Sequence, residues 1–190
     1  NGATQNGWIR IRDGANYTLT GNPTVAQMNP GGVATNGHLS YSTYTLTTTS
    51  MWYCTFYNHF NSGMLNLKGG GSVDVSKSDY GTGVLWINSS VNGFNFNLDD
   101  NYYTVWFNNS AGATKFGSSA KDVQLNMHLW VRGGELDMSS AGLNAVRVGG
   151  NFTNDALFSA STCIITMNGS IPQFINGTSI TTFNKLIIAN

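Results

Sequence analysis

The chain has 190 residues, which suits one domain large enough to bury a substantial core. Only 9% of the residues are charged, against roughly 25% in ordinary globular domains, and nine basic residues balance nine acidic ones. A chain without a basic stripe has nothing to neutralise phosphates, so we expect no nucleic-acid partner. No apolar run approaches the roughly 18 residues of a membrane-spanning helix. The 12% of aromatic residues argues against intrinsic disorder.

The N-terminal lead, residues 1–30, contains one strand candidate. Apolar and basic residues alternate over residues 8–12, and Asp13-Gly14 follows as a turn signal. Two interpretations are open: an edge strand of the domain, or an arm that pairs with the open sheet edge of a neighbouring molecule. The candidate arm residues are Trp8, Ile9, Arg10, Ile11 and Arg12.

Aromatic residues gather in two segments of the middle of the chain. The first holds Trp52, Tyr53, Phe56, Tyr57 and Phe60, and the second holds Tyr102, Tyr103, Trp106 and Phe107. Aromatic side chains in strands usually fill a core. The functional alternative is an exposed platform that stacks on sugar rings, which requires two or three exposed rings in one plane.

The last third of the chain, residues 133–190, sets the fold class. Short apolar segments recur about every ten residues, and Gly, Asn or Ser separates them, which is typical of a series of short strands. No window has the apolar spacing of a helix. We predict an all-β protein and favour a parallel β-solenoid, with a jelly-roll or another antiparallel β-sandwich as the alternative.

An internal similarity divides the predicted domain into two parts. Residues 86–90 match residues 166–170 at an offset of 80, and residues 104–109 align with residues 185–190 at an offset of 81. We interpret these matches as two degenerate repeats of about 80 residues, 31–109 and 110–190, stacked in one solenoid domain.

Two cysteines, Cys54 and Cys163, lie in apolar segments. They are either two buried thiols or a disulfide between the repeats, for which chain-entropy estimates give about 4–5 kcal/mol of stabilisation. The chain also holds six Asn-x-Ser/Thr sequons, which are glycosylation acceptors only on exposed loops of a secreted protein. The sequon residues are Asn16, Asn88, Asn108, Asn151, Asn168 and Asn176.

Residues that carry chemistry are few. His38, His59 and His128 are far apart in sequence from one another and from both cysteines, so we interpret them as isolated and predict no metal site. The acids able to pair for glycoside hydrolysis or to hold calcium are Asp74, Asp79, Asp99, Asp100 and Asp137, and Asp99-Asp100 is typical of a turn. We predict no catalytic residues and no cofactor, and therefore a protein that is not an enzyme.

Motifs from about Trp106 onward resemble a known class of repeat. The segments FNNSAGATKF, GGELDM, VGGNFTN, ITMNGS and TTFNKLIIAN are similar to the low-complexity β-repeats of large secreted and surface proteins of Bacteroidota-type bacteria. The resemblance extends from Trp106 to the C-terminal segment and implies a β-solenoid or β-sandwich stalk or adhesin at the cell surface, without catalytic residues. The aromatic segments and the N-terminal lead depart from that pattern and suggest a self-contained subunit.

We therefore expect a non-enzymatic extracellular structural protein. The chain begins at Asn1 without an initiator Met, which is typical of a processed mature protein. Its C-terminal segment ends where another repeat unit would begin, so we expect an open sheet edge that accepts another copy, and a filament that grows head to tail. The alternatives are a glycan-binding adhesin module and, third, a small β-helical polysaccharide-degrading enzyme.

Overall fold

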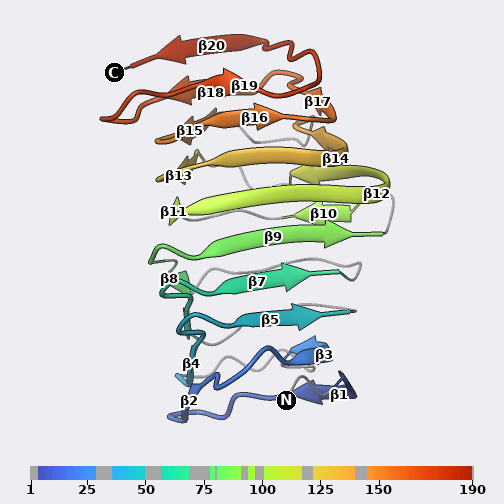
Figure 1. Cartoon of the computed structure of the whole chain (residues 1–190), viewed down its shortest axis with the longest axis vertical. Coiled ribbons are helices and arrows are strands. Elements are labelled where there is room, and N and C mark those ends of the chain that lie inside the picture. Colours follow the sequence, from blue (N-terminus) through green and yellow to red (C-terminus); the bar gives the residue numbers. More distant parts are fainter. Residues whose placement is uncertain are drawn as a thin grey trace.

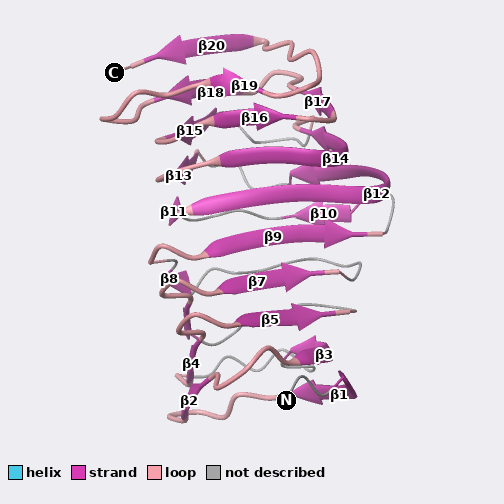
Figure 2. Ribbon diagram, viewed as in Figure 1, coloured by secondary structure: helices cyan, strands magenta, loops and turns pink. Residues whose placement is uncertain are grey.

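The computed structural model describes residues 4–28, 36–49, 57–68, 78–79, 81–90, 94–96, 101–116, 122–139 and 145–189. Every regular element in these ranges is a β-strand (Figure 2). The strands are β1 (Thr4–Ile9), β2 (Asn16–Thr18), β3 (Thr24–Met28), β4 (His38–Ser40), β5 (Thr45–Thr48), β6 (Tyr57–His59), β7 (Met64–Leu67), β8 (Ser78–Asp79), β9 (Val84–Ser89) and β10 (Phe94–Phe96). They continue with β11 (Asn101–Tyr102), β12 (Thr104–Phe116), β13 (Val123–Leu125), β14 (Leu129–Asp137), β15 (Ala145–Val148), β16 (Phe152–Asn154), β17 (Leu157–Ser159), β18 (Ile164–Met167), β19 (Ile175–Asn176) and β20 (Lys185–Ile188).

The strands stack as a parallel β-solenoid, with β1 at one end and β20 at the other (Figure 1). The first wall is a sheet with the order β1-β3-β5-β7-β9-β12-β14-β16-β19. The second wall has two shorter sheets, β2-β4-β6-β8 and β11-β13-β15-β18-β20. All of these pairs are parallel, whereas a jelly-roll pairs its strands antiparallel. The predicted parallel solenoid is confirmed, and the sandwich alternative is wrong.

The structural repeat is one coil. Met64 pairs with Val84 in the next coil of the first wall, and Val105 pairs in the same way with Leu129. The offset of about 80 is not a structural period, because residues 86–89 lie in β9 of the first wall whereas residues 166–167 lie in β18 of the second wall. The predicted repeat boundary between residues 109 and 110 also falls inside a single strand, β12. Short β-segments rich in Asn and Gly align at several offsets, and the pairing register identifies the coil as the repeat.

A third wall forms where β12 and β14 turn a corner. The start of β12 pairs with β9, whereas its end, residues 114–116, pairs with β10. The end of β14 pairs in the same way with β17. The corner of β12 contains Asn109, whose Nδ2 donates to the Ala113 carbonyl and to Thr114 Oγ1, both at 3.1 Å. The buried Asn109 amide thereby joins the two sides of the bend and holds the corner.

The core runs along the axis between the walls. Residues of one strand alternate between the two faces of its sheet, so Val105 and Phe107 are buried while Trp106 points outward. Of the predicted aromatic segments, Phe60, Tyr102 and Phe107 are core residues, and Tyr103 packs against the core from a partly buried position. Trp52, Tyr53 and Phe56 lie outside the described residues. Most of the described aromatic side chains of these segments therefore stabilise the stack.

Candidate functional site

A ladder of three tryptophans lies on the outer face of the first wall. Trp86 in β9, Trp106 in β12 and Trp130 in β14 are register partners in three consecutive coils. The ring centroids of Trp86 and Trp106 are 6.0 Å apart at an interplanar angle of 73°, and those of Trp106 and Trp130 are 5.7 Å apart at 79°. This edge-to-face arrangement is the one that aromatic quadrupoles favour. These three rings are therefore not coplanar, unlike the flat platform that was the functional alternative for the aromatic segments.

Arg132 covers one side of the tryptophan ladder. Its Cζ lies 4.5 Å from the ring centroid of Trp130 and 5.4 Å from those of Trp86 and Trp106. A guanidinium at such a distance from an indole ring is attracted by the ring's electron density. The exposed Arg132 therefore links the three rings into one unit.

Asp155 fixes the orientation of Trp130. The indole Nε1 donates a hydrogen bond of 2.7 Å to Asp155 Oδ2, and the other carboxylate oxygen accepts bonds from Thr178 N (2.9 Å) and Thr178 Oγ1 (3.1 Å). The Trp130 bond, followed by the backbone bond from Thr178, lowers the pKa of the Asp155 carboxyl. The charged form of Asp155 is thus the form that holds the ring.

A groove of about 410 Å³ lies beside the ladder. It crosses four consecutive strands of the first wall, from β9 to β16, at their N-terminal ends. Its described lining combines aromatic rings with hydroxyl and amide groups and includes no carboxylate, ammonium or guanidinium. The lining residues are Thr82, Val84, Tyr103, Thr104, Trp106, His128, Trp130, Asn151 and Thr153.

Two of the three histidines, His38 and His59, lie together, which corrects the sequence-based interpretation that they are isolated. His38 Nδ1 and His59 Nε2 share a hydrogen bond of 2.8 Å, and the two rings stack at 5.1 Å. Tyr57, the register partner of His38 in β6, stacks on the His38 ring at 4.9 Å. In the groove, His128 Nδ1 accepts a bond of 3.0 Å from the backbone N–H of Asn151. Within the described part of the chain, no three metal-ligating side chains gather into a possible metal site.

The acids of the sequence analysis are only partly described. Asp137 Oδ1 accepts a hydrogen bond from the backbone of Ser139, and the nearby Glu135 accepts a short bond of 2.5 Å from Ser159 Oγ. Asp79 lies in β8. Asp74, Asp99 and Asp100 lie outside the described residues.

Most sequon asparagines use their amides to join coils. Asn108 Nδ2 donates to Asn88 Oδ1 (2.8 Å), and Asn168 Nδ2 donates to Gln124 (3.0 Å). The Oδ1 of Asn151 accepts the backbone N–H of Phe174, and the Oδ1 of Asn176 accepts Thr153 Oγ1. A glycan on Asn108 or Asn168 would replace one hydrogen of the amide that makes the bond. Asn16, exposed on β2, and Asn176, exposed on β19, are the sequon sites most open to solvent.

Cys163 is a free, fully buried thiol. Burial raises its pKa to about 11. Cys54, the partner that the disulfide alternative requires, lies outside the described residues. Cys163 therefore makes no disulfide bond in this structure.

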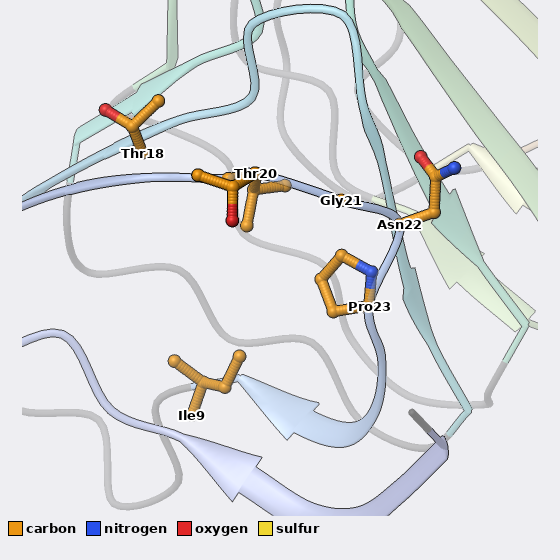
Figure 3. A pocket seen from close by; sticks show the side chains of 7 residues that line it. Ile9, Thr18, Thr20, Gly21, Asn22 and Pro23 are labelled. Carbon is orange, nitrogen blue, oxygen red and sulfur yellow. The ribbon is translucent and has the colours of Figure 1, made fainter. Parts of the chain in front are cut away.

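The two ends of the stack differ. At the N-terminal end, two of the candidate arm residues, Trp8 and Ile9, lie in the edge strand β1 and pair with Gln27 and Met28 of β3, and Ile11 is buried. The exposed Arg10 and Arg12 flank Ile11. A hollow of about 320 Å³ lies in this first coil, where Ile9 faces the turn formed by residues 18–23 (Figure 3).

In the last described coil, three apolar side chains occupy core positions and are exposed to solvent. Ile175 pairs with Phe152, Leu186 with Ile165, and Ile188 with Met167, and all three of these partners are buried. The three residues themselves are 41%, 38% and 61% exposed, respectively. Their strands, β19 and β20, are the last of their sheets (Figure 1).

Comparison with known proteins does not place the chain in a family: no protein-family model, no curated protein and no solved structure matches it. Among the described residues, no helix is long and apolar enough to cross a membrane.

Proposed function

We propose that the protein is a non-enzymatic structural solenoid of an extracellular surface fibre, in which copies add end to end. The observation that carries this proposal is the exposure of Ile175, Leu186 and Ile188 at positions that the preceding coil buries. Fully burying a side chain of this size stabilises a protein by about 1.5–3 kcal/mol. Because roughly half of each side chain is exposed, covering all three with another copy would stabilise the end-to-end contact by about 2–4 kcal/mol.

A second copy of the chain has the matching end. Because all strand pairs along the first wall are parallel, β1 and β19 present opposite edges of the same ladder. The free edge of β1 in one copy can therefore continue the ladder from β19 of another. Such a contact joins two different surfaces, so it does not close on itself and repeats from copy to copy.

The polar groups of the described walls also support a structural role. Side chains that often serve in catalysis are engaged in bonds between coils, as in the His38–His59 pair and the Glu135–Ser159 pair. Hydroxyl and amide groups give the low-charge surface its solubility, which suits a secreted protein.

The proposal is tested by light scattering and negative-stain electron microscopy over a series of concentrations. We expect the chain to form filaments, and the triple variant Ile175→Ser, Leu186→Ser, Ile188→Ser to stay monomeric with unchanged circular dichroism. The control is Leu157→Ser, which removes an apolar side chain that is 55% exposed on β17, in the coil before the last. A monomeric parent chain at every concentration, or a triple variant that assembles like the control, would overturn the proposal.

A further inference from the structure

We propose that the groove beside the tryptophan ladder binds an extended chain of neutral pyranose sugars, lying along the solenoid axis. This binding is non-covalent and independent of whether copies associate end to end. It assigns a ligand class to a surface that the structural role leaves unused.

The lining of the groove has the chemistry of a sugar site. A pyranose ring presents apolar C–H faces and a rim of hydroxyl groups, and it is bound by an aromatic surface together with neutral donors and acceptors. Tyr103, Trp106 and Trp130 supply the aromatic surface, and Thr104, Asn151 and Thr153 supply hydroxyl and amide groups. Because no described lining residue is an acid, a lysine or an arginine, the groove favours an uncharged ligand over a phosphate or a uronic acid chain.

The groove also has the direction and repeat of a linear polymer. Val84, Thr104, His128 and Asn151 line it from four consecutive coils. Neighbouring strands lie about 4.7–4.9 Å apart, so the four positions span about 14 Å along the axis. One coil spacing is close to the length of one sugar in an extended β-linked chain. Successive sugars therefore meet successive coils.

Perpendicular rings can line a groove, whereas coplanar rings would form a flat surface. With Trp106 and Trp130 at 79° to each other, one indole offers its face while the other offers its edge. Asp155 locks Trp130, and Arg132 stacks over the ladder without lining the groove. Rings held in place before binding lose little conformational entropy when the ligand arrives.

A peptide fits this surface less well. An extended peptide binds a sheet mainly through main-chain hydrogen bonds at an open edge. Beneath the groove, β9, β12 and β14 are each paired with a strand on both sides. The centre of the wall therefore offers side chains only, and a second copy of the chain has no free edge to join there.

Isothermal titration calorimetry with cellohexaose, xylohexaose and mannohexaose tests the proposal. We expect at least one of these neutral hexasaccharides to bind, and Trp106→Ala to weaken that binding at least tenfold. The control is Trp8→Ala, since Trp8 is 60% exposed on β1, away from the groove. Oligogalacturonate, as an anionic probe, should bind more weakly than the neutral sugars.

A fluorescence readout keeps the test valid if Trp106→Ala does not fold. The chain has five tryptophans, so the variant Trp8→Phe, Trp52→Phe retains only those of the ladder. A bound hexasaccharide should shift its emission with the same affinity as the calorimetric value. Several results would overturn the proposal: no binding of any neutral probe at millimolar concentration, tighter binding of oligogalacturonate, equal loss in Trp8→Ala, or binding without a change in ladder emission.

Discussion

Replacing Asn154 by alanine tests how the corners of the solenoid are held. This asparagine is fully buried at the end of β16. Its Nδ2 donates to the Ile180 carbonyl at 3.2 Å and to Thr181 Oγ1 at 3.0 Å, and its Oδ1 accepts the backbone N–H of Ala156 at 3.2 Å. One side chain therefore shapes its own turn and anchors the next coil.

The expected loss follows from these three bonds. A hydrogen bond contributes about 0.5–1.5 kcal/mol net, and a polar group left buried without a partner costs more. Ile180 is itself 89% exposed, so we count only a small penalty at that site. We expect Asn154→Ala to lower the free energy of unfolding by about 2–4 kcal/mol.

Urea unfolding followed by circular dichroism measures this loss. The matched control is Asn176→Ala, which removes an exposed amide whose Oδ1 accepts a hydrogen bond from Thr153 Oγ1 at 2.7 Å. The control should lose less than about 1 kcal/mol. If Asn154→Ala is no more destabilising than Asn176→Ala, the buried amide does not hold the corner and the reasoning fails.

Three further predictions concern a thiol, a carboxyl and a glycine. Because burial raises the pKa of Cys163 to about 11, its thiol should resist iodoacetamide at about pH 8 in the folded chain and react after unfolding. Mass spectrometry of the labelled peptide measures this difference, and equal labelling of Cys163 in both states would contradict the prediction. Because the pKa of Asp155 is lowered, its carboxylate stabilises the folded chain fully at a pH above the ordinary pKa of 3.8. This stabilisation is lost as the pH falls through the lowered pKa. Emission of Trp130 should therefore change below about pH 4, and Asp155→Asn should abolish the transition; a transition that persists in the variant refutes this. Gly134 has φ +72° and no room for a Cβ, so Gly134→Ala should cost about 1–3 kcal/mol in urea unfolding, whereas Gly21→Ala, in open space, should be neutral.

The sequence predicted the fold class because alternation and composition are local signals. Short β-branched and aromatic segments separated by Gly and Asn predict strands wherever they occur, and the ten-residue spacing was compatible with a solenoid. The ten-residue spacing of apolar segments did not reveal that one coil is the structural repeat, because that spacing counts the strands of all walls together. Register depends on the corners between walls, whose lengths vary from coil to coil.

The candidate site shows this limit at particular residues. The chain from Trp106 to Trp130 is longer than the chain from Trp86 to Trp106, so no single period aligns the ladder. His38 and His59 were judged isolated for the same reason, although they meet in neighbouring coils. A search for outward residues that recur once per coil, with a tolerance of several residues in coil length, would have found both sets. The Asp155–Trp130 bond lay beyond sequence reasoning, because it depends on side-chain directions.

X-ray diffraction from aligned, concentrated samples of the chain tests end-to-end stacking most directly. Strands that lie across the axis and continue from one copy to the next should give a reflection at about 4.7–4.9 Å along the direction of the filament. Filaments with that reflection across their axis, or particles that never elongate, would contradict a ladder that passes from β19 of one copy to β1 of the next.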